Sequence, residues 1–317
     1  MSRARSERGF ALVAVLLVLA FMGIIGAEFA FSMRLEATAA RVYKENIIAG
    51  HLAEAGLEQA IREIVADYRY VGLGDENDRE ADKECPLVFY GVNREALKPL
   101  PRKNVPLGGG QFSYCITDEE SRVNINNAPP DRLNRLLEAI GLERVDRDTV
   151  LDSIADWRDP NEDHRLNGAE SEDTYLKLSV PYRSKNANLD STAELVQIKG
   201  ITPKLLEGAE GKPGLLSLVT VVTPGQVNIN TVGKEVARAL NVSEAVFSDI
   251  EQARRNGPIT ATGGRYPPGF ATTSRTFRVE AQGLVEGQVR ARLTAVVQKR
   301  NDQGGESVVV REWSGVR

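Results

Sequence analysis

The stretch RSERGFALVAVLLVLAFMGIIGAEFAF, residues Arg5–Phe31, decides the first element of this chain. Basic residues precede Gly9, and the eighteen residues Phe10–Ala27 carry no charge and are almost all apolar. A secretory signal has an apolar core of only about 7–15 residues, with its cleavage site close behind. As a helix, Phe10–Phe31 spans roughly 30 Å, the thickness of a bilayer core. The stretch therefore predicts a transmembrane anchor.

The helical pattern continues beyond this anchor. Between Arg34 and Ala66 there is no proline, and the only glycines are Gly50 and Gly56. Apolar residues recur there at near-helical spacing: Leu52, Ala55, Leu57, Ala60, Ile61, Ile64 and Val65. We predict one long helix over residues 10–68, membrane-embedded first and amphipathic afterwards. The basic residues ahead of it favour a cytoplasmic N-terminus, with the remainder of the chain across the membrane.

Composition narrows the function classes. The chain has 317 residues, 26% of them charged, and a net charge of −4. This length allows one sizeable hydrophobic core or two. A nucleic-acid surface needs clustered positive charge, so the acidic balance argues against nucleic acid as a partner. The sequence shows no zinc-ligand spacing, Ser-His-Asp grouping or Gly-rich phosphate loop, and we predict no enzymatic activity.

The chain has two cysteines, Cys85 and Cys115. If they lie outside the cytoplasm, the compartment permits a disulfide, and an even count suits one. Two separate free thiols are the alternative, because the sequence does not give the distance between them.

Short strand-like runs flank a helical middle. Residues 70–86 and 98–110 are rich in charge, Gly and Pro, and we predict loops there. Two β-rich runs lie on either side of Glu286-Gly287, which is a hairpin signal. The predicted strands are Leu87–Tyr90, Gln111–Thr117, the two halves of Thr276–Lys299, and Ser307–Trp313. A helical region from about 119 to 260 inserted into a small sheet gives an α+β fold.

The helical region contains a sequence pattern that occurs twice. RVNINNAPPDRLNRLLEAIGL (Arg122–Leu142) and QVNINTVGKEVARALNV (Gln226–Val242) share V-N-I-N followed by a helix. We predict helix N-caps at these polar positions: Asn126 or Asn127, and Asn230 or Thr231. Between them, ELVQIKGITPKLLEG (Glu194–Gly208) reads as helix, turn at Gly200, helix. The units resemble helix-hairpin-helix elements that seat a phosphate, with Lys199 and Lys204 nearby. A plain helical packing unit is the alternative.

The acidic segment ADWRDPNEDHRLNGAESEDTY (Ala155–Tyr175) is the one constellation with metal chemistry. Ca²⁺ takes six to eight hard oxygens, which alternate side chains on a curling loop supply. The spacing matches a twelve-residue calcium loop, although position 6 is His164 where Gly is expected. The predicted ligands are Asp159, Asn161, Asp163, Arg165 through its carbonyl, Glu170 and Asp173. A solvated acidic loop is the alternative.

These pieces together resemble a known family. RGFALVAVLLVLAF resembles a type IV pilin-like leader and anchor, cut by prepilin peptidase between Gly9 and Phe10. Three further segments occur in an order that is similar to the minor pseudopilin K family of type II secretion systems. They are RVNIN, the segment from ADWRDPNEDHRLNGAE to ELVQIKGIT, and VTPGQVNINT. The likeness covers the N-terminal helix and most of residues 119–232.

The resemblance implies a long N-terminal helix, a pilin-like small antiparallel sheet and a large inserted all-α domain of helix-hairpin-helix or SAM-like units. The implied boundaries are a leader at 1–9, a transmembrane and stem helix at 10–68, a pilin-like body at 69–118 with 265–317, and an inserted domain at 119–264. It also implies a place at the pseudopilus tip in the inner membrane and periplasm, and methylation after processing. The implied partners are minor pseudopilins I and J, the major pseudopilin and prepilin peptidase, and calcium is implied as a cofactor.

Position 14 bears on the tip assignment. Most pilin-like subunits carry Glu at the fifth mature position, where it neutralises a neighbouring subunit's amine; here that residue is Ala14. An unpaired charge in a bilayer costs at least a few kcal/mol, so a subunit with no neighbour above it loses nothing with Ala. Without the leader, Ala14 is an ordinary anchor residue. Two other function classes remain as alternatives: a membrane-anchored DNA-binding protein of competence type and an anchored periplasmic enzyme.

Overall fold

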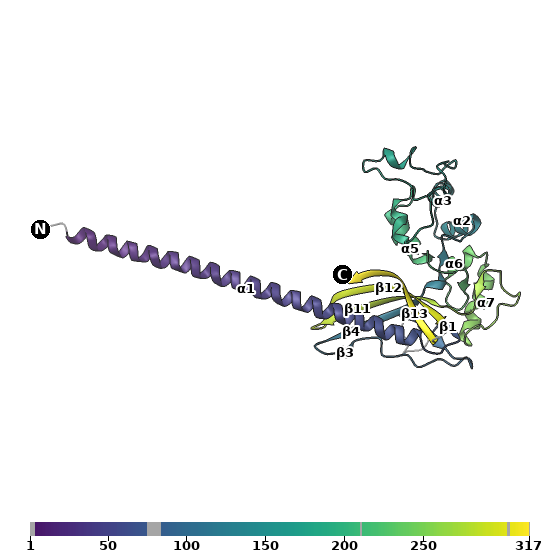
Figure 1. The fold of residues 1–317 in the computed structure, drawn as a ribbon, viewed down its shortest axis with the longest axis horizontal. Coiled ribbons are helices and arrows are strands. Elements are labelled where there is room, and N and C mark those ends of the chain that lie inside the picture. The colour runs from purple at the N-terminus through teal and green to yellow at the C-terminus, as the bar shows by residue number, and fades with distance from the viewer. Residues whose placement is uncertain (1–3, 75–83, 210, 303–304, 317) are drawn as a thin grey trace.

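A computed structural model describes the chain except residues 1–3, 75–83, 210, 303–304 and 317. Its first element, α1, is a single helix over Ala4–Ile64, 61 residues long (Figure 1). The prediction of one long helix is confirmed, with its end at Ile64. Only the second half of α1 packs against the rest of the molecule, through small and apolar residues at helical spacing: Ala49, Leu52, Ala53, Leu57, Ala60 and Ile64.

The C-terminal half of α1 lies on a five-stranded antiparallel sheet of order β13-β12-β11-β4-β3. The strands are β3 Val105–Leu107, β4 Gly110–Asp118, β11 Thr276–Val285, β12 Gln288–Asp302 and β13 Gly305–Val316. Glu286 and Gly287 both have positive φ, 53° and 75°, as a two-residue type I′ hairpin turn needs. The predicted hairpin is therefore confirmed.

One glycine lets helix and sheet approach closely. A Cβ on Gly283 of β11 would lie 1.8 Å from the carbonyl oxygen of Ala49 in α1. Any larger residue there would push the helix off the sheet.

Two predicted loops contain strands. β1 Tyr70–Leu73 pairs with β2 Leu87–Tyr90, so the loop prediction for residues 70–86 was wrong at its start. The reason is that Val71 is fully buried in the same core as Phe89. Similarly, β3 lies inside the predicted loop 98–110, because it pairs with β4 along three residues.

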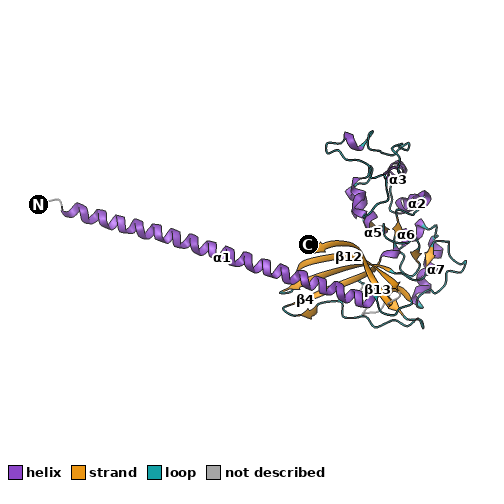
Figure 2. Ribbon diagram, in the orientation of Figure 1, coloured by secondary structure: helices purple, strands orange, loops and turns teal. Residues whose placement is uncertain are grey.

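The chain leaves the sheet after β4 and returns to the adjacent strand β11, so everything between forms an insertion with its own hydrophobic core. Figures 1 and 2 show its helices gathered beside the sheet. The helices are α2 Pro130–Ala139, α3 Arg144–Arg158, α4 Pro203–Glu207, α5 Leu215–Leu218, α6 Lys234–Ala239 and α7 Glu244–Arg255. Short 3-10 turns cover Glu119–Ser121, Tyr175–Lys177 and Thr192–Gln197.

The inserted region also contains short strand pairs that sequence patterns did not predict. They are β5 Val123–Asn124 with β8 Val219–Thr220, β6 Gly208–Ala209 with β7 Lys212–Pro213, and β9 Val227–Asn228 with β10 Phe270–Ala271. The fold as a whole is α+β, as predicted. Because β10 pairs with β9, we propose that the inserted domain continues to about residue 275, past the predicted end at 264.

The predicted N-caps are wrong. The residue before α2 is Pro129 and the residue before α6 is Gly233, and neither caps through its side chain. The V-N segments instead form the parallel strand pairs β5–β8 and β9–β10. The asparagines that follow bind backbone groups far along the chain, which satisfies more of the fold than a local cap would.

Candidate functional site

The apolar end of α1 projects from the molecule (Figure 1). It belongs to the one helix, among the residues that the structure describes, that is long and apolar enough to cross a membrane, with a window of mean hydropathy 2.8. Gly9 and Phe10, the predicted cleavage pair, lie within the continuous helix α1, and Ala14 follows one turn later on its exposed surface. Nothing in the rest of the described chain covers this segment, so its apolar side chains need a lipid or protein environment.

Cys85 and Cys115 form a disulfide, with their Cα atoms 5.5 Å apart. The bond fastens the segment that precedes β2 to the middle of β4. It therefore closes a loop between the small β1–β2 ribbon and the main sheet.

The acidic segment begins at the end of α3. Asp156 is fully buried, and its carboxylate accepts hydrogen bonds from the backbone N–H of Arg165 and Ala169 at 3.1 and 2.9 Å. The Arg165 guanidinium lies between Asp156 and Asp159, 2.5 and 2.6 Å from their oxygens. A Cβ on Gly168 would lie 1.8 Å from the Asp156 carboxylate, so only glycine fits there. Asp156 thus organises the loop.

The six predicted ligands do not converge in this structure. Asn161 and Asp163 are exposed, and Asn161 is engaged in short-range turns with Asp159 and Asp163. Asp173 accepts from Glu170 N–H at 3.0 Å. Among the residues described, no set of three Asp, Glu, His or Cys side chains is grouped as a metal site.

Glu170 is the predicted ligand with unsatisfied bonding capacity. It is 1% exposed, and burial raises the pKa of its carboxyl group. Its Oε2 accepts from the Ser184 hydroxyl at 2.6 Å, while its Oε1 has no partner. A buried carboxylate oxygen without a partner is costly, and a cation is one group that would satisfy it.

A second unpaired oxygen lies in the same hydrogen-bonded chain. The Ser184 hydroxyl contacts that of Ser171, which donates to Glu162 Oε1, and Glu162 also accepts from Asn186 Nδ2 at 3.1 Å. Asn186 Oδ1 is buried and has no partner. Sequence analysis missed Asn186, because it lies outside the loop spacing and is brought in by a positive-φ turn (φ 50°).

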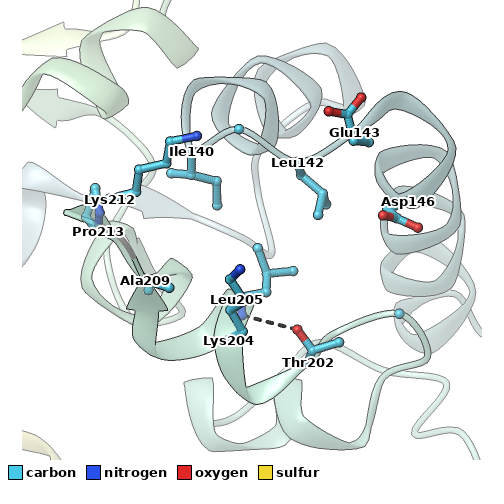
Figure 3. Close-up of a pocket in the computed structure, with 13 residues that line it drawn as sticks. Ile140, Leu142, Glu143, Asp146, Thr202, Lys204, Leu205, Ala209, Lys212 and Pro213 are labelled. Atoms are coloured by element: carbon cyan, nitrogen blue, oxygen red, sulfur yellow. Dashed lines mark hydrogen bonds between the residues drawn. The ribbon is translucent and has the colours of Figure 1, made fainter.

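The helical hairpins line an open pocket of about 520 Å³ (Figure 3). The turn glycines Gly141 and Gly200, both with φ 84°, line it. Figure 3 shows Glu143 and Asp146 on one side and Lys212 on the other. Lys199, named above as a phosphate-binding residue, instead donates to Gly168 O at 2.9 Å and so fastens the acidic loop. The Lys199 side chain is thus engaged within the chain, and the DNA-binding alternative gains no support.

Sequence comparison finds relatives among secretion proteins. Residues 115–211 match the family model described as type II secretion system (T2SS), protein K. The chain is 27% identical to type II secretion system protein K of Pectobacterium carotovorum subsp. carotovorum over 320 residues, covering 90% of this chain and 88% of the relative. It is 26% identical to the protein of that name from Pseudomonas aeruginosa over 246 residues, covering 74% and 68%. A relative from Escherichia coli strain K12 is 25% identical over 237 residues, and the chain spans 65% of its length.

Structural comparison finds the same fold in a chain of the GspK-GspI-GspJ complex from the enterotoxigenic Escherichia coli type 2 secretion system. The TM-score is 0.58, the sequence identity 16%, and the superposition covers 86% of this chain and 97% of that one. The likeness is one of fold, and it covers most of both chains.

Proposed function

We propose that this chain, which belongs to the type II secretion system protein K family, is a minor pseudopilin that caps the tip of a periplasmic pseudopilus and helps to start its assembly. The observation that carries the proposal is the combination of one 61-residue helix, a pilin-like sheet and a large insertion between adjacent strands. The helix provides an anchor and a stem, and the bulky insertion leaves one end of the subunit unsuited to further stacking.

The N-terminus supports an anchored, processed subunit. Prepilin peptidase would cut between Gly9 and Phe10, after which Phe10 carries the mature, methylated amine. The apolar segment of α1 would span the inner membrane once, with the body in the periplasm. Ala14 at the fifth mature position suits a subunit with no neighbour above it.

Processing is open to a direct test. Gly9→Leu should block cleavage, because a bulky residue replaces the glycine at the cut, whereas Gly9→Ala should be tolerated. N-terminal sequencing of both variants gives the answer: a Gly9→Leu chain that begins at Phe10 would contradict the assigned cut.

The partners that fit this function are minor pseudopilins I and J, with the major pseudopilin below them. The solved complex with the same fold contains GspI and GspJ, and we transfer that partnership to this chain. Deleting the gene in its own bacterium should trap exported proteins in the periplasm, and a plasmid copy should restore export. Unchanged export after deletion would contradict the proposal.

We also propose that the acidic loop binds Ca²⁺ and that Glu170 is a ligand. The sequence spacing offers Asp159, Asn161, Asp163, Arg165 and Asp173 as its companions. The unpaired oxygens of Glu170 and Asn186 favour a different set, with Glu162 beside them in the same hydrogen-bonded chain, because Arg165 already pairs with Asp159. When bound, the ion would neutralise these hard oxygens, and the two serine hydroxyls would keep the carboxylates oriented.

Matched variants separate the two ligand sets. Calcium at about 100 times its Kd should stabilise the wild-type chain by about 2.7 kcal/mol relative to chelator. Glu170→Gln and Asn186→Ala should abolish this difference, while Asp163→Asn should retain it. The reverse pattern, with Asp163→Asn losing the calcium effect, would restore the spacing-based ligands, and no calcium effect in wild type would refute the site.

A further inference from the structure

The insertion is joined to the sheet where two buried carboxylates lie side by side. Asp118, the last residue of β4, is 4% exposed, and Glu120, two residues later, is 5% exposed. The chain leaves the sheet at these residues and returns through Ser274, Arg275 and Thr276 into β11. Both carboxylates accept hydrogen bonds from the returning segment, so they hold the outgoing and returning segments of the chain together at the joint.

Each carboxylate is bound by neutral donors. Asp118 accepts from the Asn228 side-chain amide, the Thr231 hydroxyl and the Ser274 hydroxyl at 2.9, 2.5 and 2.6 Å. It also accepts from Glu120 N–H at 2.8 Å. The other carboxylate, Glu120, accepts from the backbone N–H groups of Arg275 and Thr276 at 3.1 and 3.0 Å.

The cations near the two carboxylates pair mainly with other groups: Arg122 is attracted to Asp118 but forms its ion pair with Glu119. Among the described residues, no Lys or Arg forms an ion pair with Asp118 or Glu120. The other charged and titratable groups facing the joint have partners of their own. Glu119 pairs with Arg278 and Arg122. Lys299 pairs with Glu306 and lies over the Tyr68 ring, and the Tyr68 hydroxyl donates to Ser274 O. The Arg275 side chain bears no ion pair that the structure records with either carboxylate.

Two ionised carboxylates buried together repel one another and lose hydration. Burial first, and then the charge of Asp118, raise the pKa of Glu120 to about 7, although the two backbone N–H bonds act in the opposite direction. Burial also raises the pKa of Asp118. The two carboxylates of the joint therefore favour holding a proton. When that proton is lost, the simplest way to accommodate the second negative charge is to admit water to the joint.

We propose that Asp118 and Glu120 form a proton-responsive clasp: protonated, it fixes the inserted domain on the sheet, and deprotonated, it loosens the joint. The clasp is independent of calcium and of partner subunits, because all its contacts are within this chain. It would let the orientation of the inserted domain follow the pH of its compartment.

Distance measurements between the two parts test the clasp. Spin labels at Arg292 of β12 and Gln252 of α7, both exposed, would report the sheet-to-insertion distance in the full chain in detergent. We expect the wild-type distance distribution to be at least 1.5-fold broader at pH 8.5 than at pH 5.5. Glu120→Gln, which imitates the protonated form, should stay narrow at both pH values, and Glu58→Gln on the exposed face of α1 should behave like wild type.

Hydrogen exchange provides a readout that needs no variant at Glu120. After correction for intrinsic rates, protection of the Arg275 and Thr276 amides should fall at least tenfold from pH 5.5 to 8.5, while that of Val279 in the middle of β11 stays constant. A wild-type distribution and amide protection that do not change with pH would overturn the proposal. Equal broadening in Glu120→Gln would overturn it as well.

Discussion

The two V-N-I-N segments have the same local geometry and different long-range partners. Asn124 accepts from Asn126 N–H at 2.9 Å, and Asn228 accepts from Asn230 N–H at the same distance. The side-chain amide of Asn124 donates to Thr223 O, within the insertion. The amide of Asn228 donates to Asp118, Ser274 and Val71, at the joint with the sheet. One sequence motif therefore builds a turn twice, and its second copy also fastens two domains.

The second asparagines extend the comparison. Asn126 exchanges two hydrogen bonds with the backbone of Leu189, in the segment that follows Asn186 of the proposed calcium site. Asn230 makes the matching pair with Ile259, and one more bond to Thr272. The first copy supports the acidic loop, and the second supports the return to the sheet.

The largest expected effect is at Asn228. Asn228→Ala leaves the buried Asp118 short of a donor, so it should destabilise the chain by roughly 3 kcal/mol. Asn124→Ala loses a hydrogen bond between neutral groups and should cost about 1 kcal/mol. Chemical denaturation of both variants measures the difference. Equal losses of unfolding free energy would show that the two copies contribute equally to stability.

A pH effect is expected at the second copy's joint. The pKa of Glu120 is about 7 in the folded chain against an ordinary 4.5, so its stabilising effect is full below about 4.5 and is lost as pH rises through about 7. Wild type should lose about 3 kcal/mol across this range relative to Glu120→Gln. Denaturation curves at several pH values measure it, with Glu58→Gln as the matched control. Parallel pH curves for wild type and Glu120→Gln would contradict it.

Calcium binding should distinguish the two V-N-I-N copies. Asn126→Ala and Asn230→Ala should each cost about 1–2 kcal/mol, because they remove two and three partly buried hydrogen bonds respectively. Only Asn126→Ala should also weaken calcium binding, about tenfold by titration calorimetry, since it frees the segment that carries Ser184 and Asn186. Calcium affinity lowered equally in both variants would place the ion elsewhere.

The smallest effect concerns the helical turns that follow each copy. Gly141 (φ 84°) and Asn241 (φ 63°) occupy equivalent positive-φ positions. Gly141→Ala should cost about 1 kcal/mol from backbone strain, and more if the Lys212 ammonium beside it cannot move. Asn241→Gly should change stability by less than about 0.5 kcal/mol. Thermal unfolding compares the pair, and a stabilising Gly141→Ala would refute the equivalence.

Local signals predicted the parts of the fold that local physics determines. The Glu286-Gly287 hairpin and strand Leu87–Tyr90 were correct, because positive-φ residues and alternating apolar residues act within a few positions. Asn126 and Asn230 of the V-N-I-N segments were misread as helix caps, because their partners lie far along the chain: Asn126 is 63 residues from Leu189. The spacing likewise led to Glu170, whereas Asn186 enters the acidic loop only through tertiary folding. Long-range polar contacts leave no periodic trace in the sequence.

The most direct test of the central claim is binding of the purified full chain to minor pseudopilins I and J in detergent, followed by native mass spectrometry. The proposed function predicts a stoichiometric complex of the three proteins, retained by Glu120→Gln because the clasp lies within this chain. Binding of I to J without incorporation of this chain would contradict its assignment as the subunit that caps them.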